Sequence, residues 1–351
     1  MEKMTTAEFG AYVQKLIEKK NLTSLESYLL FSELMTNSQP DLQQGAFLAA
    51  LIAKGETVDE IVGAWRAIDE FDTVQVEGLP DTIIDNSGTG MDNFKTFNVS
   101  SAAALIVAAH GIPVARHGAR AITSRCGTVD IMEAMGVNVE CPPEQVIQSI
   151  NSVGIGLFNG MSPYIHPGAL GRILSQIRFG TTFNIAASLA NPARPKRAIR
   201  GVHSCSLLNP VSQVMRQIGF HHGMVVHGSV DDCNGSIDEL SVCGKSYINY
   251  FDGDKIECFE IEPEDVGISR HSSSTIAALG SLEQESERFL STITGRNKYP
   301  ECEDFVALNA GAVLWMEGIS STLSDGFAEA RNTLKQGGAL DRLHLWRTSQ
   351  C

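Results

Sequence analysis

Hydrophobic positions in the first seventy residues recur at intervals of three and four, and each run follows a helix-start signal. Thr5, Thr23 and Thr57 each precede a glutamate by three positions, which is the spacing of a capping box. Asp41 is expected to cap a further helix that stops at Gly55. The pattern predicts four helices that bury a common core and carry no catalytic constellation.

From residue 81 onward, short apolar runs alternate with helical patterns, which is typical of a parallel α/β sheet. The expected elements are strands at 82–85, 112–115, 155–158 and 224–228, a strand-like segment at 247–259, helices at 101–110, 129–135, 307–316 and 324–337, and a frayed or packing tail over the last fourteen residues. The predicted fold class is α/β. A small all-helical domain (1–72, joined by part of 165–190) precedes a large domain (81–351) with a central, mostly parallel sheet.

Composition narrows the class of protein. Of the 351 residues, 43% are hydrophobic and 19% are charged, as in a globular chain with an ample core. The net charge of −14 disfavours nucleic acid and membranes as partners, because these attract a basic surface. No long apolar run or signal peptide is visible, so a cytoplasmic location is expected. The eight cysteines are scattered without a Cys-x-x-Cys pair, which favours reduced thiols over a zinc site.

The stretch 85–104 carries the main chemical signal. An apolar run leads into Gly88-Thr89-Gly90, and a small-residue helical run follows. Glycines let backbone N–H groups approach an anion, and a helix start adds donors and a favourable dipole. Side chains that could complete such a site are Asp92, Asn98, Ser100 and Ser101. The spacing fits neither a P-loop nor G-x-G-x-x-G, so phosphate binding is one interpretation and a plain tight turn is the other.

A second polar segment follows the strand expected at 112–115. It contains Arg116 and His117, and hydroxyl-bearing residues follow at 123–128. Ligands of open α/β sheets bind beyond the carboxyl ends of strands, where this segment and the glycine loop are both expected. Cationic side chains beside a glycine loop indicate a diphosphate pocket.

Acidic residues follow the strand expected at 224–228, in the pairs Asp231-Asp232 and Asp238-Glu239. Mg2+ takes one or two carboxylates together with substrate phosphates. Cation binding is therefore one interpretation of these pairs, and a solvated acidic loop is the other.

Several motifs coincide with one family. They are Gly88-Thr-Gly-Met-Asp92, Thr96-Phe-Asn-Val-Ser-Ser101, Arg116-His-Gly, Gly127-Thr-Val-Asp130, His166-Pro167, Asn191-Pro-Ala-Arg-Pro195, Val226-His-Gly228, Asp238-Glu239 and Glu262-Pro-Glu-Asp-Val-Gly267. In this order, and nearly end to end, the sequence resembles the anthranilate phosphoribosyltransferase family (glycosyltransferase family 3), which shares its fold with pyrimidine nucleoside phosphorylases.

The resemblance implies a homodimeric, two-domain enzyme of nucleoside phosphorylase/phosphoribosyltransferase-like fold. Its active site would lie in the cleft at the hinge, with phosphoribosyl pyrophosphate as donor and Mg2+ as cofactor. Residues implied in donor binding are Gly88, Thr89, Gly90, Asp92, Thr96, Asn98, Ser100, Ser101, Arg116, Cys126 and Thr128. Residues implied in metal binding are Ser100, Asp238 and Glu239, and those implied in acceptor binding are His117, Ala119, His166, Arg172 and Arg178.

The sequence departs from the family in both halves of the implied site. Met91 stands where the family usually has glycine, and Arg116 where it usually has lysine. Ala119 replaces an asparagine near the acceptor, and Cys126-Gly-Thr128 replaces Ser-Gly-Ser. The segment 166–184 is shorter than usual, which leaves Arg172 and Arg178 both as candidates for the acceptor carboxylate. The donor half is kept and the acceptor half is altered.

The implied reaction transfers the phosphoribosyl group to the amine of anthranilate and releases pyrophosphate, a step of tryptophan biosynthesis. Backbone N–H groups, Arg116 and metal ions can stabilise the departing charge without a protein nucleophile. No general base is visible in the sequence. Two alternatives remain, which are a related transferase with another aromatic or heteroaromatic acceptor and a non-catalytic relative that keeps the phosphate pocket.

Overall fold

The computed structural model describes residues 3–121, 126–177 and 179–350. Its α-helices are α1 (Thr6–Ile17), α2 (Ser24–Met35), α3 (Asp41–Lys54), α4 (Val58–Phe71), α5 (Val99–Ala109), α6 (Thr128–Ala134), α7 (Pro143–Val153), α8 (Leu170–Gln176), α9 (Phe183–Ala186), α10 (Leu208–Gln217), α11 (Ser273–Ile276), α12 (Leu282–Ile293), α13 (Pro300–Met316), α14 (Leu323–Lys335) and α15 (Gly338–Ser349). Short 3-10 turns are η1 (Ala187–Leu189), η2 (Cys205–Leu207) and η3 (Pro263–Val266). The strands are β1 (Ile84–Gly88), β2 (Val114–Gly118), β3 (Ile155–Asn159), β4 (Arg197–Gly201), β5 (His222–Val230), β6 (Gly235–Ile237), β7 (Ser246–Asp252) and β8 (Lys255–Ile261).

The strands form one mostly parallel sheet in the order β3-β2-β1-β4-β5-β7-β8, and β6 pairs with β5. β3, β2, β1, β4 and β5 are parallel to one another, whereas β6, β7 and β8 join antiparallel. The carboxyl ends of the parallel strands therefore meet at a single edge, where α/β proteins bind ligands.

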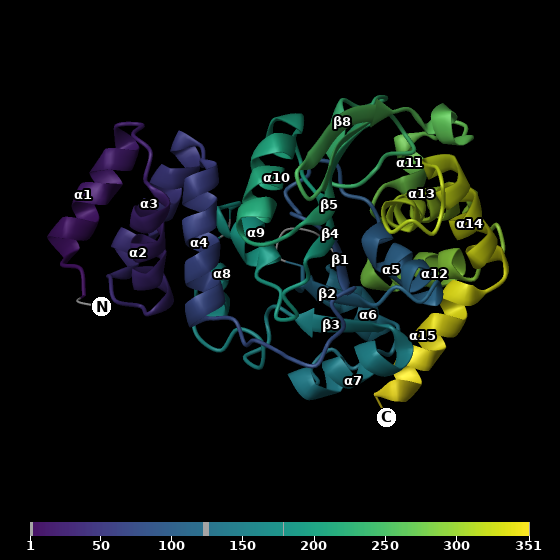
Figure 1. Cartoon of the computed structure of the whole chain (residues 1–351), viewed down its shortest axis with the longest axis horizontal. Coiled ribbons are helices and arrows are strands. Elements are labelled where there is room, and N and C mark those ends of the chain that lie inside the picture. Colours follow the sequence, from purple (N-terminus) through teal and green to yellow (C-terminus); the bar gives the residue numbers. More distant parts are fainter. Residues whose placement is uncertain (1–2, 122–125, 178, 351) are drawn as a thin grey trace.

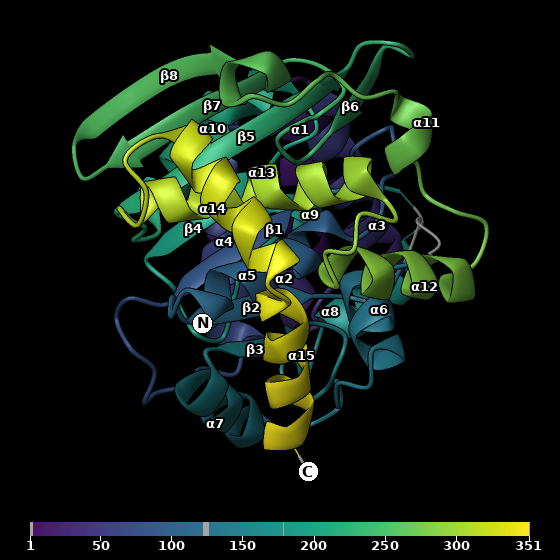
Figure 2. The ribbon, with the colours of Figure 1, turned by 90° about the vertical axis from the view of Figure 1, so that its right-hand side faces the viewer.

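The sheet lies between two helical layers (Figures 1 and 2). α5, α13, α14 and α15 cover one face, where their apolar residues share a core with Ile84, Val114 and Met224. α5 is rich in buried small residues from Ala102 to Ala104, which let it pack closely. The helical bundle α1–α4 lies on the opposite side, as Figure 1 shows.

The N-terminal helices follow their local signals. The capping boxes at Thr5, Thr23 and Thr57 are confirmed. Each threonine hydroxyl accepts the backbone N–H three residues on, and the glutamate side chain at that position accepts the backbone N–H of the threonine. The expectation for Asp41 is wrong. It is the first residue of α3, Pro40 occupies the cap position, and no side chain caps that helix.

Two strands lie later in the chain than expected, because hydrogen bonds to neighbouring strands set their bounds. β1 pairs with β4 through Gly88, and β2 pairs with β3 through Gly118. Arg116 and His117 are consequently inside a strand rather than in the loop after it.

Other elements were not expected from the sequence. β4 was missed, as were α7, α10 and α12, and the segment 247–259 is a two-stranded hairpin, β7–β8. Of the two alternatives for the last residues, packing is confirmed and fraying is wrong, since they form α15 and Trp346 is fully buried there.

We call the segment that carries α8 and α9 the hinge region, and it lies between the two parts of the chain. α8 and α9 share a hydrophobic core with α4 and the rest of the helical bundle. We therefore keep as a proposal the boundaries 1–72, joined by part of 165–190, and 81–351. Within the described ranges, no helix is long and apolar enough to cross a membrane.

Candidate active site

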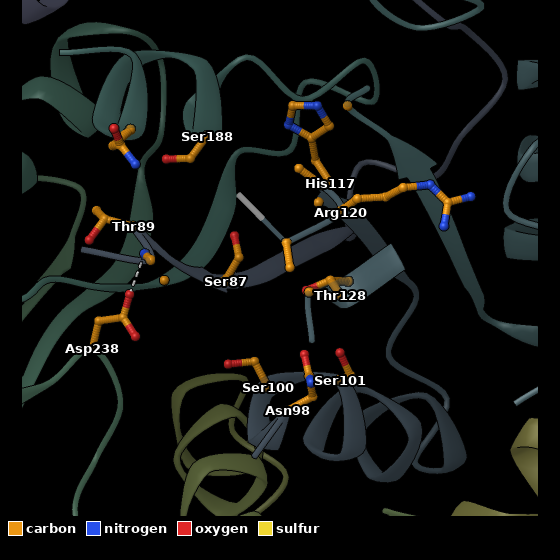
Figure 3. A pocket seen from close by; sticks show the side chains of 18 of the residues that line it. Ser87, Thr89, Asn98, Ser100, Ser101, His117, Arg120, Thr128, Ser188 and Asp238 are labelled. Carbon is orange, nitrogen blue, oxygen red and sulfur yellow. Dashed lines mark hydrogen bonds between the residues drawn. The ribbon is translucent and has the colours of Figure 1, made fainter. Parts of the chain in front are cut away.

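A cavity of about 310 Å³ opens at the carboxyl ends of the parallel strands. That volume is within the range of small-molecule sites. The predicted site residues that line it are Gly88, Thr89, Gly90, Asp92, Thr96, Asn98, Ser100, Ser101, Arg116, His117, Ala119, Cys126, Thr128, His166, Asp238 and Glu239. Figure 3 shows Asn98, Ser100 and Ser101 at one end, and His117 and Ser188 at the other.

The first turn of α5 forms the wall at one end. Asn98 is its cap residue, and its side-chain amide lies 3.3 Å from the Cys126 sulfur, which ties the turn to the loop after β2. Backbone N–H groups in a first helical turn have no intrahelical acceptor and favour anions. This end of the cavity is therefore suited to a phosphate.

Arg116 adds a buried cation behind that turn. Its guanidinium donates to the Ser101 hydroxyl, and its Nε has no partner among the described residues. Burial lowers the pKa of Arg116 to about 10, which still leaves it charged at neutral pH. The partly satisfied guanidinium can accommodate a further anionic ligand.

The Asp238 loop passes very close to two strand ends, which requires glycine there. A Cβ at Gly88 would collide with the Asp238 carboxylate, and one at Gly201 would collide with the Asp238 carbonyl oxygen. The carboxylate accepts the Gly90 N–H at 2.6 Å, and the Thr89 N–H donates to the Gly201 carbonyl. These two loop amides, expected to bind an anion, are thus engaged inside the protein.

Three carboxylates converge below the glycine loop. Burial and the nearby Asp238 raise the pKa of Asp92 to about 6. Burial and the same neighbour raise the pKa of Glu239 well above its ordinary value. Lys95 offsets part of the charge, since its Nζ lies 2.8 Å from Asp92 and 3.0 Å from the Gly90 carbonyl. Such mutual repulsion favours binding of a cation.

The acidic cluster fits Mg2+ completed by substrate oxygens. Glu239 Oε2 and Asn86 Oδ1 are buried and have no partner among the described residues. Both residues line a side chamber of about 20 Å³, together with Ser100 and Asp238, and this is room for one small ion or water. In the described part of the chain, no group of three or more His, Cys, Asp or Glu residues could hold a metal. Phosphate oxygens would therefore supply the remaining ligands.

A pair of uncharged histidines forms the other end of the cavity. His166 Nδ1 lies 2.7 Å from the Asp72 carbonyl, which only accepts, so this nitrogen carries the proton. Burial lowers the pKa of both imidazoles, so His166 Nε2 is unprotonated and accepts from His117 Nε2 at 3.0 Å. With this tautomer His117 Nδ1 is a proton acceptor; it is buried and has no partner at ordinary hydrogen-bond geometry among the described residues, and the Ser188 backbone lies close to the imidazole.

The structure does not bring every predicted residue to the cavity. Arg172 is not among the described residues that line it, because its guanidinium binds the Leu34 carbonyl and Gln44 in the helical bundle. The structure therefore does not bring Arg172 to the cavity. Arg178 lies outside the described residues.

Two loop side chains have their partners outside the cavity. Arg120 lines the cavity, but its guanidinium extends away from it, as Figure 3 shows, and donates to Glu133 and Glu140. The Met91 side chain is directed at Gly180, where an added Cβ would meet its methyl carbon at 2.6 Å. Met91 therefore links the glycine loop to the segment before α9.

The first acidic pair is not part of the cation cluster. Asp231 binds Arg270, and Asp232 accepts from the Ser272 hydroxyl and the Ser273 N–H. Asp238 and Glu239 line the cavity instead.

Sequence reasoning missed several lining residues. These include Ser87, Lys95, Phe183, Asn184 and Ser188. For Ser87 and Lys95 a signal was available, because both lie within or next to the glycine loop. Phe183, Asn184 and Ser188 reach the cavity only through the packing of α9 and η1, which no local pattern reveals.

Comparison with known proteins identifies the family. Residues 80–340 match the model described as glycosyl transferase family, a/b domain, and residues 11–71 match its helical bundle domain. The chain is 35% identical over 342 residues to the anthranilate phosphoribosyltransferase of Methanothermobacter thermautotrophicus, covering 96% of each chain. It is 34% identical over 338 residues to that of Persephonella marina, covering 96% of this chain and 97% of the relative.

Solved structures agree with this assignment. The anthranilate phosphoribosyltransferase of Thermus thermophilus aligns with a TM-score of 0.85 at 31% identity, covering 96% of this chain and 98% of that one. That of Saccharomyces cerevisiae, in complex with PRPP and Mg, aligns with a TM-score of 0.85 at 21% identity over 99% of both chains, which shows the shared fold. The chain belongs to the glycosyl transferase family of the anthranilate phosphoribosyltransferases and is a phosphoribosyltransferase enzyme.

Proposed function

We propose that the enzyme transfers the 5-phosphoribosyl group of phosphoribosyl pyrophosphate to the amine of anthranilate and releases pyrophosphate, with Mg2+ as cofactor. The observation that carries the proposal is a single cavity that holds a helix N-terminus with Arg116 on one side and the carboxylates Asp92, Asp238 and Glu239 on another. Such a cavity suits a ligand that combines an anion with a metal ion. Related enzymes bear this activity in their names, and the yeast relative binds PRPP and Mg.

The donor end binds the charged parts of phosphoribosyl pyrophosphate. The α5 turn and Arg116 take phosphate oxygens through unused donors. Asp238 and Glu239, with Ser100 nearby, would hold Mg2+, which when bound would supply positive charge against the diphosphate. The Gly90 N–H, which Asp238 accepts in this structure, would be available to the diphosphate if Asp238 served as a metal ligand instead.

Bond cleavage at ribose C1 leaves positive charge on the sugar and negative charge on the pyrophosphate. Arg116 and the helix N-terminus stabilise the leaving charge, so the protein needs no nucleophile. At the opposite end, His117 Nδ1 accepts a hydrogen bond from the attacking amine and takes its proton after C–N bond formation. His166 fixes the tautomer of His117.

The acceptor half supports a second candidate. Ala119 lines the cavity with a methyl group only, and Arg172 is engaged in the helical bundle. A related transferase that uses another aromatic or heteroaromatic acceptor therefore remains the alternative. Homodimer formation and the substrate roles of the lining residues, including Thr96, Cys126, Thr128 and Arg178, belong to the proposal.

The test is steady-state consumption of anthranilate with phosphoribosyl pyrophosphate and Mg2+, followed by loss of anthranilate fluorescence. We expect metal-dependent turnover that Asp238→Asn/Glu239→Gln abolishes. The matched control, Asp254→Asn/Glu257→Gln, carries the same changes on the exposed β7–β8 hairpin and should retain activity. Donor binding by calorimetry without anthranilate turnover would favour the alternative acceptor and lead to a screen of aromatic amines. Binding without turnover of any amine would favour a non-catalytic relative.

A further inference from the structure

A fully buried ion pair lies beneath the cavity. Arg200 on β4 and Asp85 on β1 have completely buried side chains and are joined at 2.9 Å. Desolvating two charges offsets most of the energy that their attraction returns, so a buried pair is weak evidence for a stabilising role. Stability alone therefore does not explain why these two charges are buried together, and a role in function would.

The guanidinium of Arg200 also fixes the role of Ser87. Its NH1 lies 2.5 Å from the Ser87 hydroxyl oxygen, and because a guanidinium can only donate, Ser87 must accept. The proton of that hydroxyl then needs another acceptor. The Asp85 carboxylate oxygens lie at 3.4 and 3.5 Å, which is long for O–H···O. The hydroxyl proton is therefore available to a ligand.

Ser87 faces the substrates at the middle of the cavity. Along β1, Asn86 points to the α5 side, where its amide binds the Ser100 carbonyl, and alternation directs Ser87 to the opposite face. Figure 3 shows Ser87 between Ser100 at one end and His117 at the other. This is the place at which donor and acceptor must meet.

We propose that Ser87 is a substrate-binding residue that donates a hydrogen bond to an anionic oxygen at mid-cavity, and that Arg200 and Asp85 are positioning residues. Arg200 strengthens the donor, since a hydroxyl that accepts from a cation becomes a better donor itself. The proposal rests on the proposed function, which supplies two sources of such an oxygen. These are the diphosphate beside the glycine loop and the carboxylate of the acceptor.

The test compares Ser87→Ala with Ser87→Thr, which keeps the hydroxyl. Loss of one hydrogen bond to a charged group is expected to weaken binding by about tenfold or more. Calorimetry with Mg2+-pyrophosphate tests whether the anionic oxygen belongs to the diphosphate. The KM for anthranilate is compared with that for aniline, which lacks the carboxylate, to test whether the anionic oxygen belongs to the acceptor. Ser152→Ala, a change of the same size on the exposed side of α7, is the matched control.

Either of two results for Ser87→Ala supports the proposal, which are a tenfold loss of pyrophosphate affinity or a tenfold rise in KM for anthranilate but not for aniline. In either case Ser87→Thr should restore the wild-type value. A change below twofold in both measurements overturns it. Failure of the proposed function is distinguishable, because the wild-type enzyme would then bind pyrophosphate without consuming anthranilate, and the calorimetric comparison would still decide.

The positioning role has its own measurement. Arg200→Lys shortens the reach to Ser87, and we expect it to produce the same loss as Ser87→Ala and to add nothing in the double variant. A full additional loss in the double variant contradicts positioning through Ser87. Thermal unfolding checks that the variants fold, and the Ser87 pair decides the proposal without Arg200→Lys.

Discussion

Asp72, just after α4, ties the helical bundle to the hinge. Its buried carboxylate accepts the backbone N–H groups of Gly168 at 2.5 Å, Ala169 at 3.0 Å and Leu170 at 2.7 Å. These are the donors at the start of α8, which its own helix leaves unsatisfied. Its carbonyl accepts from His166 Nδ1, so Asp72 supports both the start of α8 and the histidine pair at that end of the cavity.

Replacing Asp72 by asparagine tests this role. The amide keeps one oxygen but turns an NH2 group toward a backbone donor, leaving at least one buried N–H unpaired, which costs about 1–3 kcal/mol. The remaining bonds lose their charge assistance. We expect a total loss of about 3 kcal/mol in unfolding free energy for Asp72→Asn, and a larger loss for Asp72→Ala.

Urea unfolding measures this loss. Fluorescence of Trp65 on α4, whose indole donates to the Leu189 carbonyl, reports on the hinge side of the bundle. Asp254→Asn at the exposed β7–β8 turn is the control and should stay within about 0.5 kcal/mol of wild type. The reasoning is refuted if Asp72→Asn is as stable as the control variant.

Three further predictions concern other buried groups. Burial lowers the pKa of His117 and His166, so the unfolded chain binds more protons; stability is full above about pH 6.5 and falls below it. His117→Gln should weaken this dependence in urea titrations at pH 7.5 and 5.5, and an unchanged dependence would contradict the uncharged pair. Trp346→Ala should cost about 3–5 kcal/mol in thermal unfolding, because the indole is fully buried, and a loss under about 1 kcal/mol would exclude that packing. Glu60→Gln should cost about 3–5 kcal/mol by urea unfolding, because the buried Lys54 ammonium then loses its counter-ion and keeps only the neutral acceptors of Asn21 and Gly55; wild-type stability would count against the ion pair.

Local signals predicted the local structure well. The capping boxes at Thr5, Thr23 and Thr57 act over three residues, so the sequence contains everything they need. The glycine loop and the start of α5 were likewise visible, because a strand, glycines and a small-residue helix are adjacent in the chain.

Long-range partners explain the failures. β4 was missed because it carries Arg197 and Arg200, which are unusual in a buried strand. Glu317 and Asp85 neutralise them from distant parts of the chain, and no local pattern reveals either partner. The position of Arg172 away from the cavity has the same cause, since only the folded bundle offers it the Leu34 carbonyl.

The packing of α15 has a consequence for the order in which the protein matures during synthesis. α15 packs against α5, the helix whose first turn forms the donor end of the cavity, and it buries Trp346. The ribosome makes α15 more than two hundred residues after α5. Domains made early fold early, so the helical bundle can form while the chain is still growing. α13 packs against the same helix and α15 completes this backing, so nascent chains should display a folded bundle before the donor end is fully supported.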